Sequence, residues 1–136
     1  MIIVDTGVLF AAADRDDPDH SISGQVLLDH IGAMVVPVPV VIETSWLIES
    51  RLGSKAEAAF LHAVAAGELS RLDLGTSEWR RVAELVEQYA DLGLGVVDAS
   101  VVAVAEKLST TTVATLNHRD FRVVRPSHCA ALDIIP

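Results

Sequence analysis

The chain has 136 residues, 51 % of them hydrophobic, and its 10 basic and 19 acidic residues give a formal net charge of −9. This length suits a single domain with a substantial core, and the mean hydropathy of +0.41 excludes a disordered chain and fits a sheet buried on both faces. The acidic balance excludes a protein that coats duplex nucleic acid with a basic surface, so any role on nucleic acid must be local.

The single cysteine, Cys129, can form neither an internal disulfide nor a thiolate zinc site. The first residues resemble a strand rather than a signal peptide. The longest apolar stretch, AMVVPVPVVI, contains two prolines and has about half the length of a membrane-spanning helix. We therefore expect a cytoplasmic protein without a membrane segment.

In chain order, the first half alternates buried strands with helices. A short strand over residues 1–4 is followed by a helix in TGVLFAAA, and the acidic loop DRDDPDH leads to a helix with Asp17 as N-cap and Pro18 as its first residue. MVVPV predicts a second strand, and a helix follows from about Val40 to Leu52. The capping box SKAE, residues 54–57, opens the next helix.

The second half continues the same alternation. LSRLDL and TTTVATL have the pattern of strands, and LDII predicts a closing strand. TSEWRRVAELVEQYADL predicts a long amphipathic helix, and VDASVVAVAEKL predicts another. Strands that alternate with one or two helices favour an α/β fold, with a mainly parallel sheet covered by helices on both faces. We expect one domain over residues 1–136.

Asp5 directly follows the apolar run Ile2-Ile3-Val4. One interpretation is structural, because Asp is among the best N-caps and a helix is expected to start at Thr6. The other is functional, because ligands of open α/β sheets bind at the carboxyl ends of the strands. Both interpretations can hold together.

Glu43 and Asp98 stand among apolar residues on their predicted helices. The helical neighbours of Glu43 are Val40, Trp46 and Leu47, which predicts a carboxylate on the apolar face. Such a carboxylate needs a partner, because an unpaired buried charge costs several kcal/mol or becomes protonated. Asp98 repeats this pattern, although capping of its own helix is an equally good explanation.

Asp120 follows the predicted strand TTTVATL, with Thr115 and Asn117 as short polar neighbours. Taken alone, it is an ordinary turn residue. Four carboxylates that converge at one sheet edge, however, would repel one another unless a divalent cation neutralised them. Oxygen ligands favour magnesium or manganese over zinc, and none of the five histidines has a convincing ligand spacing.

Four stretches in this order resemble the PIN domain, and more closely the VapC-type ribonuclease toxins of prokaryotic type II toxin–antitoxin pairs. They are IIVDTGVL, VVIETSWLI, VVDASVVAVAE and VATLNHRDFRVVRP. The resemblance implies a three-layer α/β/α fold and a metal pocket of Asp5, Glu43, Asp98 and a fourth acid, with Thr6 as a polar helper. Many similar proteins carry Asp at the position of Asn117, whereas others place the acid at the position of Asp120. We assign the fourth acid to Asp120 and keep Asn117 as a neutral ligand or an orienting group.

The resemblance also implies an activity and partners. We expect an endoribonuclease that uses one or two Mg²⁺ or Mn²⁺ ions, forms a homodimer, and is blocked by a cognate antitoxin whose arginine enters the acidic pocket. The basic cluster Arg119, Arg122 and Arg125 is either a solvated turn or the contact for flanking RNA phosphates. The alternative is a PIN-like module that binds RNA or protein with little or no cleavage. A phosphoryl-accepting receiver domain is disfavoured, because no lysine follows Lys107.

Overall fold

All five strands of the chain lie parallel in one sheet with the order β3-β2-β1-β4-β5. The computed structural model describes all 136 residues. The strands are β1 (Ile2–Val4), β2 (Met34–Pro37), β3 (Ser70–Leu72), β4 (Thr112–Ala114) and β5 (Asp133–Ile135). The helices are α1 (Thr6–Ala13), α2 (His20–Asp29), α3 (Val38–Leu52), α4 (Ser54–Ala65), α5 (Thr76–Gln88), α6 (Val96–Leu108) and α7 (His118–Val123), with a 3₁₀ turn, η1 (Ala90–Leu92), after α5.

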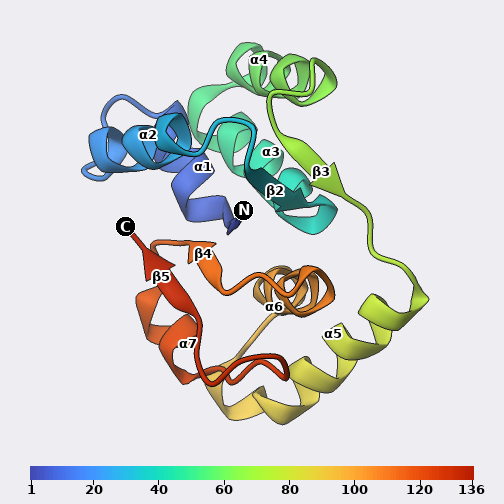
Figure 1. The fold of residues 1–136 in the computed structure, drawn as a ribbon. Coiled ribbons are helices and arrows are strands. Elements are labelled where there is room, and N and C mark those ends of the chain that lie inside the picture. Colours follow the sequence, from blue (N-terminus) through green and yellow to red (C-terminus); the bar gives the residue numbers. More distant parts are fainter.

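Figure 1 shows helices on both faces of the sheet, with α1, α2 and α4 on one side of the line of strands and α5 and α6 on the other. Parallel strands need such crossover helices, which cover both faces. The predicted three-layer α/β/α architecture is therefore confirmed, and the sheet is parallel throughout.

The core sits around the central strand β1. Ile2, Ile3 and Val4 are all buried, and Ile3 pairs with Val35 of β2 on one side and with Val113 of β4 on the other. Against this sheet, α6 buries an uninterrupted run from Ala99 to Ala105. An element that is buried on all sides has a continuous apolar run in its sequence, which explains the high hydrophobic content of the chain.

The order of strands changes direction beside β1. The chain runs from β1 outward through β2 to β3, and then returns to the other side of β1 to form β4 and β5. The carboxyl ends of β1 and β4 therefore border a topological switch point, where open α/β sheets usually bind their ligands.

One predicted helix start and one predicted capping box were wrong in detail. The helix α2 begins at His20 instead of Pro18, because the Asp17 carboxylate accepts the backbone N–H of Asp19 at 2.8 Å and holds a turn there. The predicted capping box at residues 54–57 does not form, and Glu57 instead accepts a 2.7 Å hydrogen bond from Ser45 of α3.

The segment treated as a basic turn contains the helix α7. Asn117 is its N-cap and accepts the backbone N–H of Asp120 at 3.4 Å, and Phe121 anchors the helix with only 1 % of its side chain exposed. The helix is short, so its apolar periodicity is too brief to detect in the sequence. None of the helices has the length and apolar character required to cross a membrane.

Candidate active site

An acidic cleft of about 590 Å³ lies at the switch point of the sheet. It brings together Asp5, which follows β1, Glu43 on α3 and Asp98 on α6, with Thr6 and Asn117 also in its wall. Three of the four predicted acids thus share one cleft although they come from three separate elements. Asp120 does not line the cleft.

Asp5 has the backbone position of an N-cap, yet its side chain makes no capping hydrogen bond. Its Oδ2 instead accepts a 2.7 Å hydrogen bond from the Thr115 hydroxyl. Its Oδ1 and the Thr6 hydroxyl are both buried without any partner. Burial raises the pKa of the Asp5 carboxyl, although the Thr115 hydrogen bond opposes this shift. An unpaired buried carboxylate oxygen is an arrangement that a cation would satisfy.

Asp98 stands in the first turn of α6 and does not cap it, because the N-cap is Gly95. Burial and, in decreasing order, the charges of Asp5, Glu43 and Asp120 together raise the pKa of Asp98 from 3.8 to about 7. A hydrogen bond from Asn117 partly opposes the shift. A carboxylate shifted this far by burial and by neighbouring charges marks a candidate functional site.

Glu43 is half-buried and lines two cavities, the acidic cleft and an apolar one. The helical spacing predicts a buried apolar face around Glu43, and this prediction is wrong for Trp46, whose side chain is 64 % exposed. Trp46 and Ile42 of α3 instead line an open groove of about 800 Å³, which Trp79 of α5 also lines. Glu43 therefore stands where this groove and the acidic cleft meet.

Asn117 connects the remaining polar groups. Its Nδ2 donates hydrogen bonds to Asp98 Oδ2 at 3.1 Å and to Asp120 Oδ2 at 3.0 Å. Its backbone N–H donates to the Thr115 hydroxyl at 3.0 Å. The hydrogen bonds from Asn117 and then from Arg119 lower the pKa of Asp120, so that Asp120 stays ionised beside the cleft.

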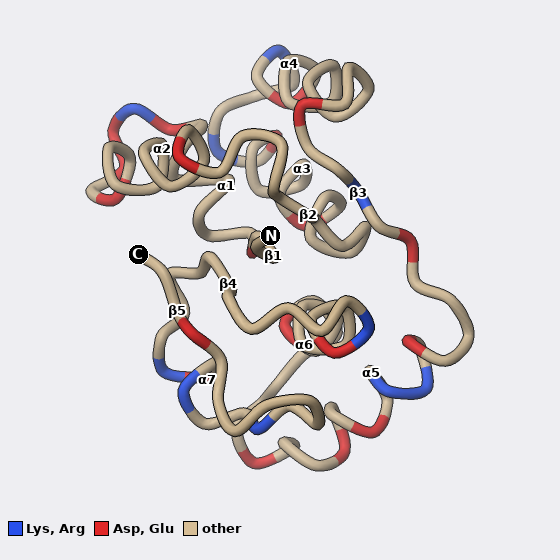
Figure 2. The backbone as a smooth tube through the Cα atoms, viewed as in Figure 1, with Lys and Arg blue, Asp and Glu red and all other residues tan.

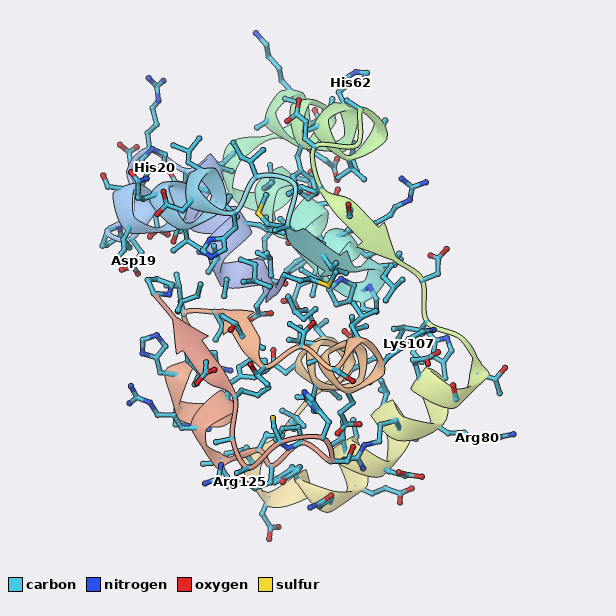
Figure 3. The ribbon with its side chains drawn as sticks, viewed as in Figure 1. Asp19, His20, His62, Arg80, Lys107 and Arg125 are labelled. Carbon is cyan, nitrogen blue, oxygen red and sulfur yellow. The ribbon has the colours of Figure 1, made fainter.

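The three arginines of the cluster lie on and after α7, where Figure 2 shows basic positions gathered. Arg119 is 78 % exposed and forms an ion pair of 3.0 Å with Asp120. Arg122 is also exposed, and Arg125 lies where the end of α7 meets the segment after α5 (Figure 3). The Arg125 backbone N–H donates to the Tyr89 hydroxyl at 2.9 Å. None of the three side chains lines the acidic cleft.

Sequence reasoning missed the apolar and glycine residues that shape the cleft. They are Gly7, Leu47, Gly95, Val96, Val97 and Leu116. Gly7 and Gly95 carry a signal in the sequence, since each is a glycine within three residues of a predicted acid. A glycine beside a strand or helix end permits a close approach of the backbone: a Cβ at Gly7 would lie 3.4 Å from Leu116 Cβ.

The donor set suits a hard divalent cation. Carboxylate and hydroxyl oxygens are the ligands that magnesium and manganese prefer, and Asp5 Oδ1 and Thr6 Oγ1 are buried without partners. No three His, Cys, Asp or Glu side chains are clustered as a ready-made metal site. Magnesium, however, is commonly held by one or two carboxylates together with water and substrate phosphates. The four-carboxylate ligand set therefore stays a prediction.

The family model of the PIN domain matches residues 2–125, which is nearly the whole chain. The chain belongs to the PIN domain family. This PIN domain is 33 % identical over 135 residues to ribonuclease VapC26 of Mycobacterium tuberculosis (strain ATCC 25618 / H37Rv), and the match covers 99 % of this chain and 100 % of that protein. The family resemblance expected from the four sequence stretches is confirmed.

Solved structures share the fold of this PIN domain. The crystal structure of Mycobacterium tuberculosis VapC20, a toxin that cleaves the sarcin–ricin loop, superposes with a TM-score of 0.84 at 18 % identity, with 100 % of both chains covered. DNA-bound VapBC from Salmonella typhimurium superposes with a TM-score of 0.71 at 18 % identity and covers 98 % of this chain and 97 % of that chain. At such identities the likeness shows the fold alone.

Proposed function

We propose that this PIN domain is a divalent-metal-dependent endoribonuclease and the toxin of a toxin–antitoxin pair. The observation that carries the proposal is the shared cleft of Asp5, Glu43 and Asp98 at the switch point of the sheet. The 33 % identity to a ribonuclease over the full length of both chains supports the same activity.

Asp5, Glu43 and Asp98 would hold one or two Mg²⁺ or Mn²⁺ ions, with the Thr6 hydroxyl as a further oxygen beside them. A divalent cation bound there would lower the pKa of a water molecule and offset the charge of the scissile phosphate. Without such a cation, an acidic cleft in a chain of net charge −9 would repel the RNA backbone. Metal binding therefore accounts for substrate binding as well as for reactivity.

The chain's own polar residues would hold the acids in place. Thr115 orients Asp5 through its 2.7 Å hydrogen bond, and Asn117 orients Asp98 through its side-chain amide. Water attacks phosphorus in line and the P–O3′ bond breaks, which leaves a 5′-phosphate and a 3′-hydroxyl. Precise placement of the acids matters, because a misplacement of about 1 Å can lower a rate about a hundredfold.

Flanking phosphates of the RNA would contact the exposed arginines after β4. Arg122 and Arg125 are exposed and are not ion-paired to any carboxylate. Arg119 pairs with Asp120 through Nε, so its two terminal nitrogens would contact the phosphate while that ion pair stays in place. Such contacts position the RNA but carry no sequence information.

We further propose a cognate antitoxin and a homodimer, in the cytoplasm. An arginine of the antitoxin would enter the acidic cleft, where unpaired carboxylate oxygens accept it bidentately. The chain also exposes large apolar side chains, and Ile42, Trp46 and Trp79 share one open groove. A contiguous apolar surface of this kind is typical of a protein interface. The structures of VapBC complexes from Salmonella typhimurium and Rickettsia felis share this fold and are consistent with such a partner.

The decisive experiment is RNA cleavage with purified protein in Mg²⁺ or Mn²⁺, compared with an Asp98→Asn variant. Cleavage should fall by at least about 10²-fold in the variant and stop in excess chelator, while the circular dichroism spectrum stays unchanged. Equal cleavage by both proteins, or cleavage in chelator, would disprove the metal site. No cleavage by the wild type, together with retained RNA binding, would favour the alternative of a non-catalytic PIN-like module.

A further inference from the structure

We propose that Asp120 is a positioning residue, which acts by holding the Asn117 amide that orients Asp98, and that it does not bind the metal. This inference rests on the proposed metal-dependent nuclease activity and refines the site that carries it. It reassigns the fourth acid predicted from the sequence from the metal to the hydrogen-bond network behind the cleft.

The first observation is that both oxygens of Asp120 are already occupied. Oδ1 accepts the 3.0 Å hydrogen bond from Arg119 Nε, and Oδ2 accepts the 3.0 Å hydrogen bond from Asn117 Nδ2. Asp5 and Asp98 differ from it, because each uses only Oδ2 for a side-chain hydrogen bond. Asp5 and Asp98 each line the cleft and have one carboxylate oxygen free for a cation. Asp120 does not line the cleft and has no free oxygen.

The second observation is that the Asn117 amide is fixed in orientation. Its Nδ2 carries two hydrogens and donates to two carboxylates, Asp98 and Asp120, while its Oδ1 accepts the backbone N–H of Asp120. A flipped amide would turn its oxygen toward both carboxylates and lose both hydrogen bonds. The Asp120 carboxylate therefore adds to the preference for the orientation in which Asn117 Nδ2 faces Asp98.

The third observation is that this network reaches the other acid of the cleft. The Asn117 backbone N–H donates to Thr115 Oγ1, and the Thr115 hydroxyl donates to Asp5 Oδ2. A chain of hydrogen bonds thus runs from Asp120 through Asn117 to Asp98, and through Thr115 to Asp5. Outer residues of this kind usually affect metal affinity about 10–100-fold, although they never touch the metal.

The test is a double-mutant cycle on Mn²⁺ affinity, measured by isothermal titration calorimetry on the full chain. Asp120→Ala and Asn117→Ala should each weaken Mn²⁺ binding by about tenfold. Asp120→Ala should cause no further loss in the Asn117→Ala background, because its effect passes through that amide. A metal ligand would instead lose the same affinity in both backgrounds, and additive losses would overturn the proposal.

Asp120→Asn separates the two roles even if the alanine variant folds poorly. The new side chain keeps a carbonyl oxygen for the Asn117 amide but loses the negative charge. As a positioning group it should retain Mn²⁺ affinity within about threefold, whereas a metal ligand should lose as much as Asp98→Asn loses. A loss equal to that of Asp98→Asn would overturn the proposal.

The Asp98→Asn protein also distinguishes this proposal from the function on which it rests. If Asp98→Asn loses both Mn²⁺ binding and cleavage while the Asn117–Asp120 cycle is additive, the nuclease stands and only the positioning role fails. If Asp98→Asn changes neither quantity, the proposed function itself fails.

Discussion

Thr115 donates a 2.7 Å hydrogen bond to Asp5 Oδ2, and this bond joins two residues that are 110 positions apart in the chain. Both residues directly follow strands that are neighbours in the sheet, β4 and β1. The bond lies at the topological switch point, and it leaves Oδ1 as the unpaired oxygen of Asp5. The acid is thereby held with one oxygen bound to the protein and the other free for a ligand.

Removal of the Thr115 hydroxyl should weaken both the fold and the site. Thr115 is fully buried, so Thr115→Val leaves Asp5 Oδ2 unpaired, and the free energy of unfolding should fall by about 1–3 kcal/mol in urea titrations. Thr115→Ser keeps the hydroxyl and is the matched control. Equal stability of the Val and Ser variants would show that the hydrogen bond contributes nothing.

The stability of the metal-free protein should fall as the pH rises toward 8. The folded pKa of Asp98 is raised from 3.8 to about 7, so its contribution is fully present below about pH 4 and is lost as the pH rises through 7. After allowance for solvent screening, the loss should be about 1–3 kcal/mol. Asp98→Asn should flatten this pH dependence, as measured by thermal unfolding in chelator. A profile unchanged by the substitution would contradict the raised pKa.

Glu43 should matter for metal binding and Glu49 should not, although both stand on α3. Glu43 lines the acidic cleft, whereas Glu49 is exposed and lines no cavity. Glu43→Gln should weaken Mn²⁺ binding at least about tenfold, and Glu49→Gln should leave it unchanged. Calorimetric titration measures the Mn²⁺ affinity of both variants. Similar affinities would remove Glu43 from the predicted metal ligands.

Divalent metal should stabilise the wild-type fold, because a ligand that binds only the native state raises the free energy of unfolding. At a Mn²⁺ concentration of about 100 times its dissociation constant, the gain should be about 2.7 kcal/mol. The gain should vanish in Asp98→Asn. Thermal unfolding in Mn²⁺, compared with thermal unfolding in chelator, measures this gain in stability. An equal gain in both proteins would indicate binding elsewhere.

Phe121 should support the site from a distance. Its side chain is 1 % exposed and holds α7 against the core, so Phe121→Ala should lower the free energy of unfolding by about 3–5 kcal/mol. Because α7 carries Asp120, the variant should also lose Mn²⁺ affinity. Phe60→Ala, which truncates a half-buried phenylalanine of α4, should reduce stability while Mn²⁺ affinity stays unchanged. Equal Mn²⁺ affinity in the two variants would contradict this role of α7.

The layer architecture and three of the acids follow from local pattern. Buried parallel strands appear as short apolar runs such as Ile2–Val4, and helices of suitable period separate them. Because the carboxyl ends of parallel strands share one edge, the sequence predicts that an acid following β1 lies at the ligand edge. The structure places Asp5, Glu43 and Asp98 in one cleft there.

The tertiary structure alone decided which polar groups meet. Hydrogen bonds such as Thr115 to Asp5 join residues that are distant in sequence, and no local pattern encodes their geometry. The same limit explains the errors at Trp46 and Glu57: helical period identifies an apolar face of α3, but only packing decides whether that face is covered. Asp120 is the clearest example of this limit. The sequence predicts its place after β4, whereas its hydrogen bonds to Asn117 and Arg119 depend on how α7 packs against the core through Phe121.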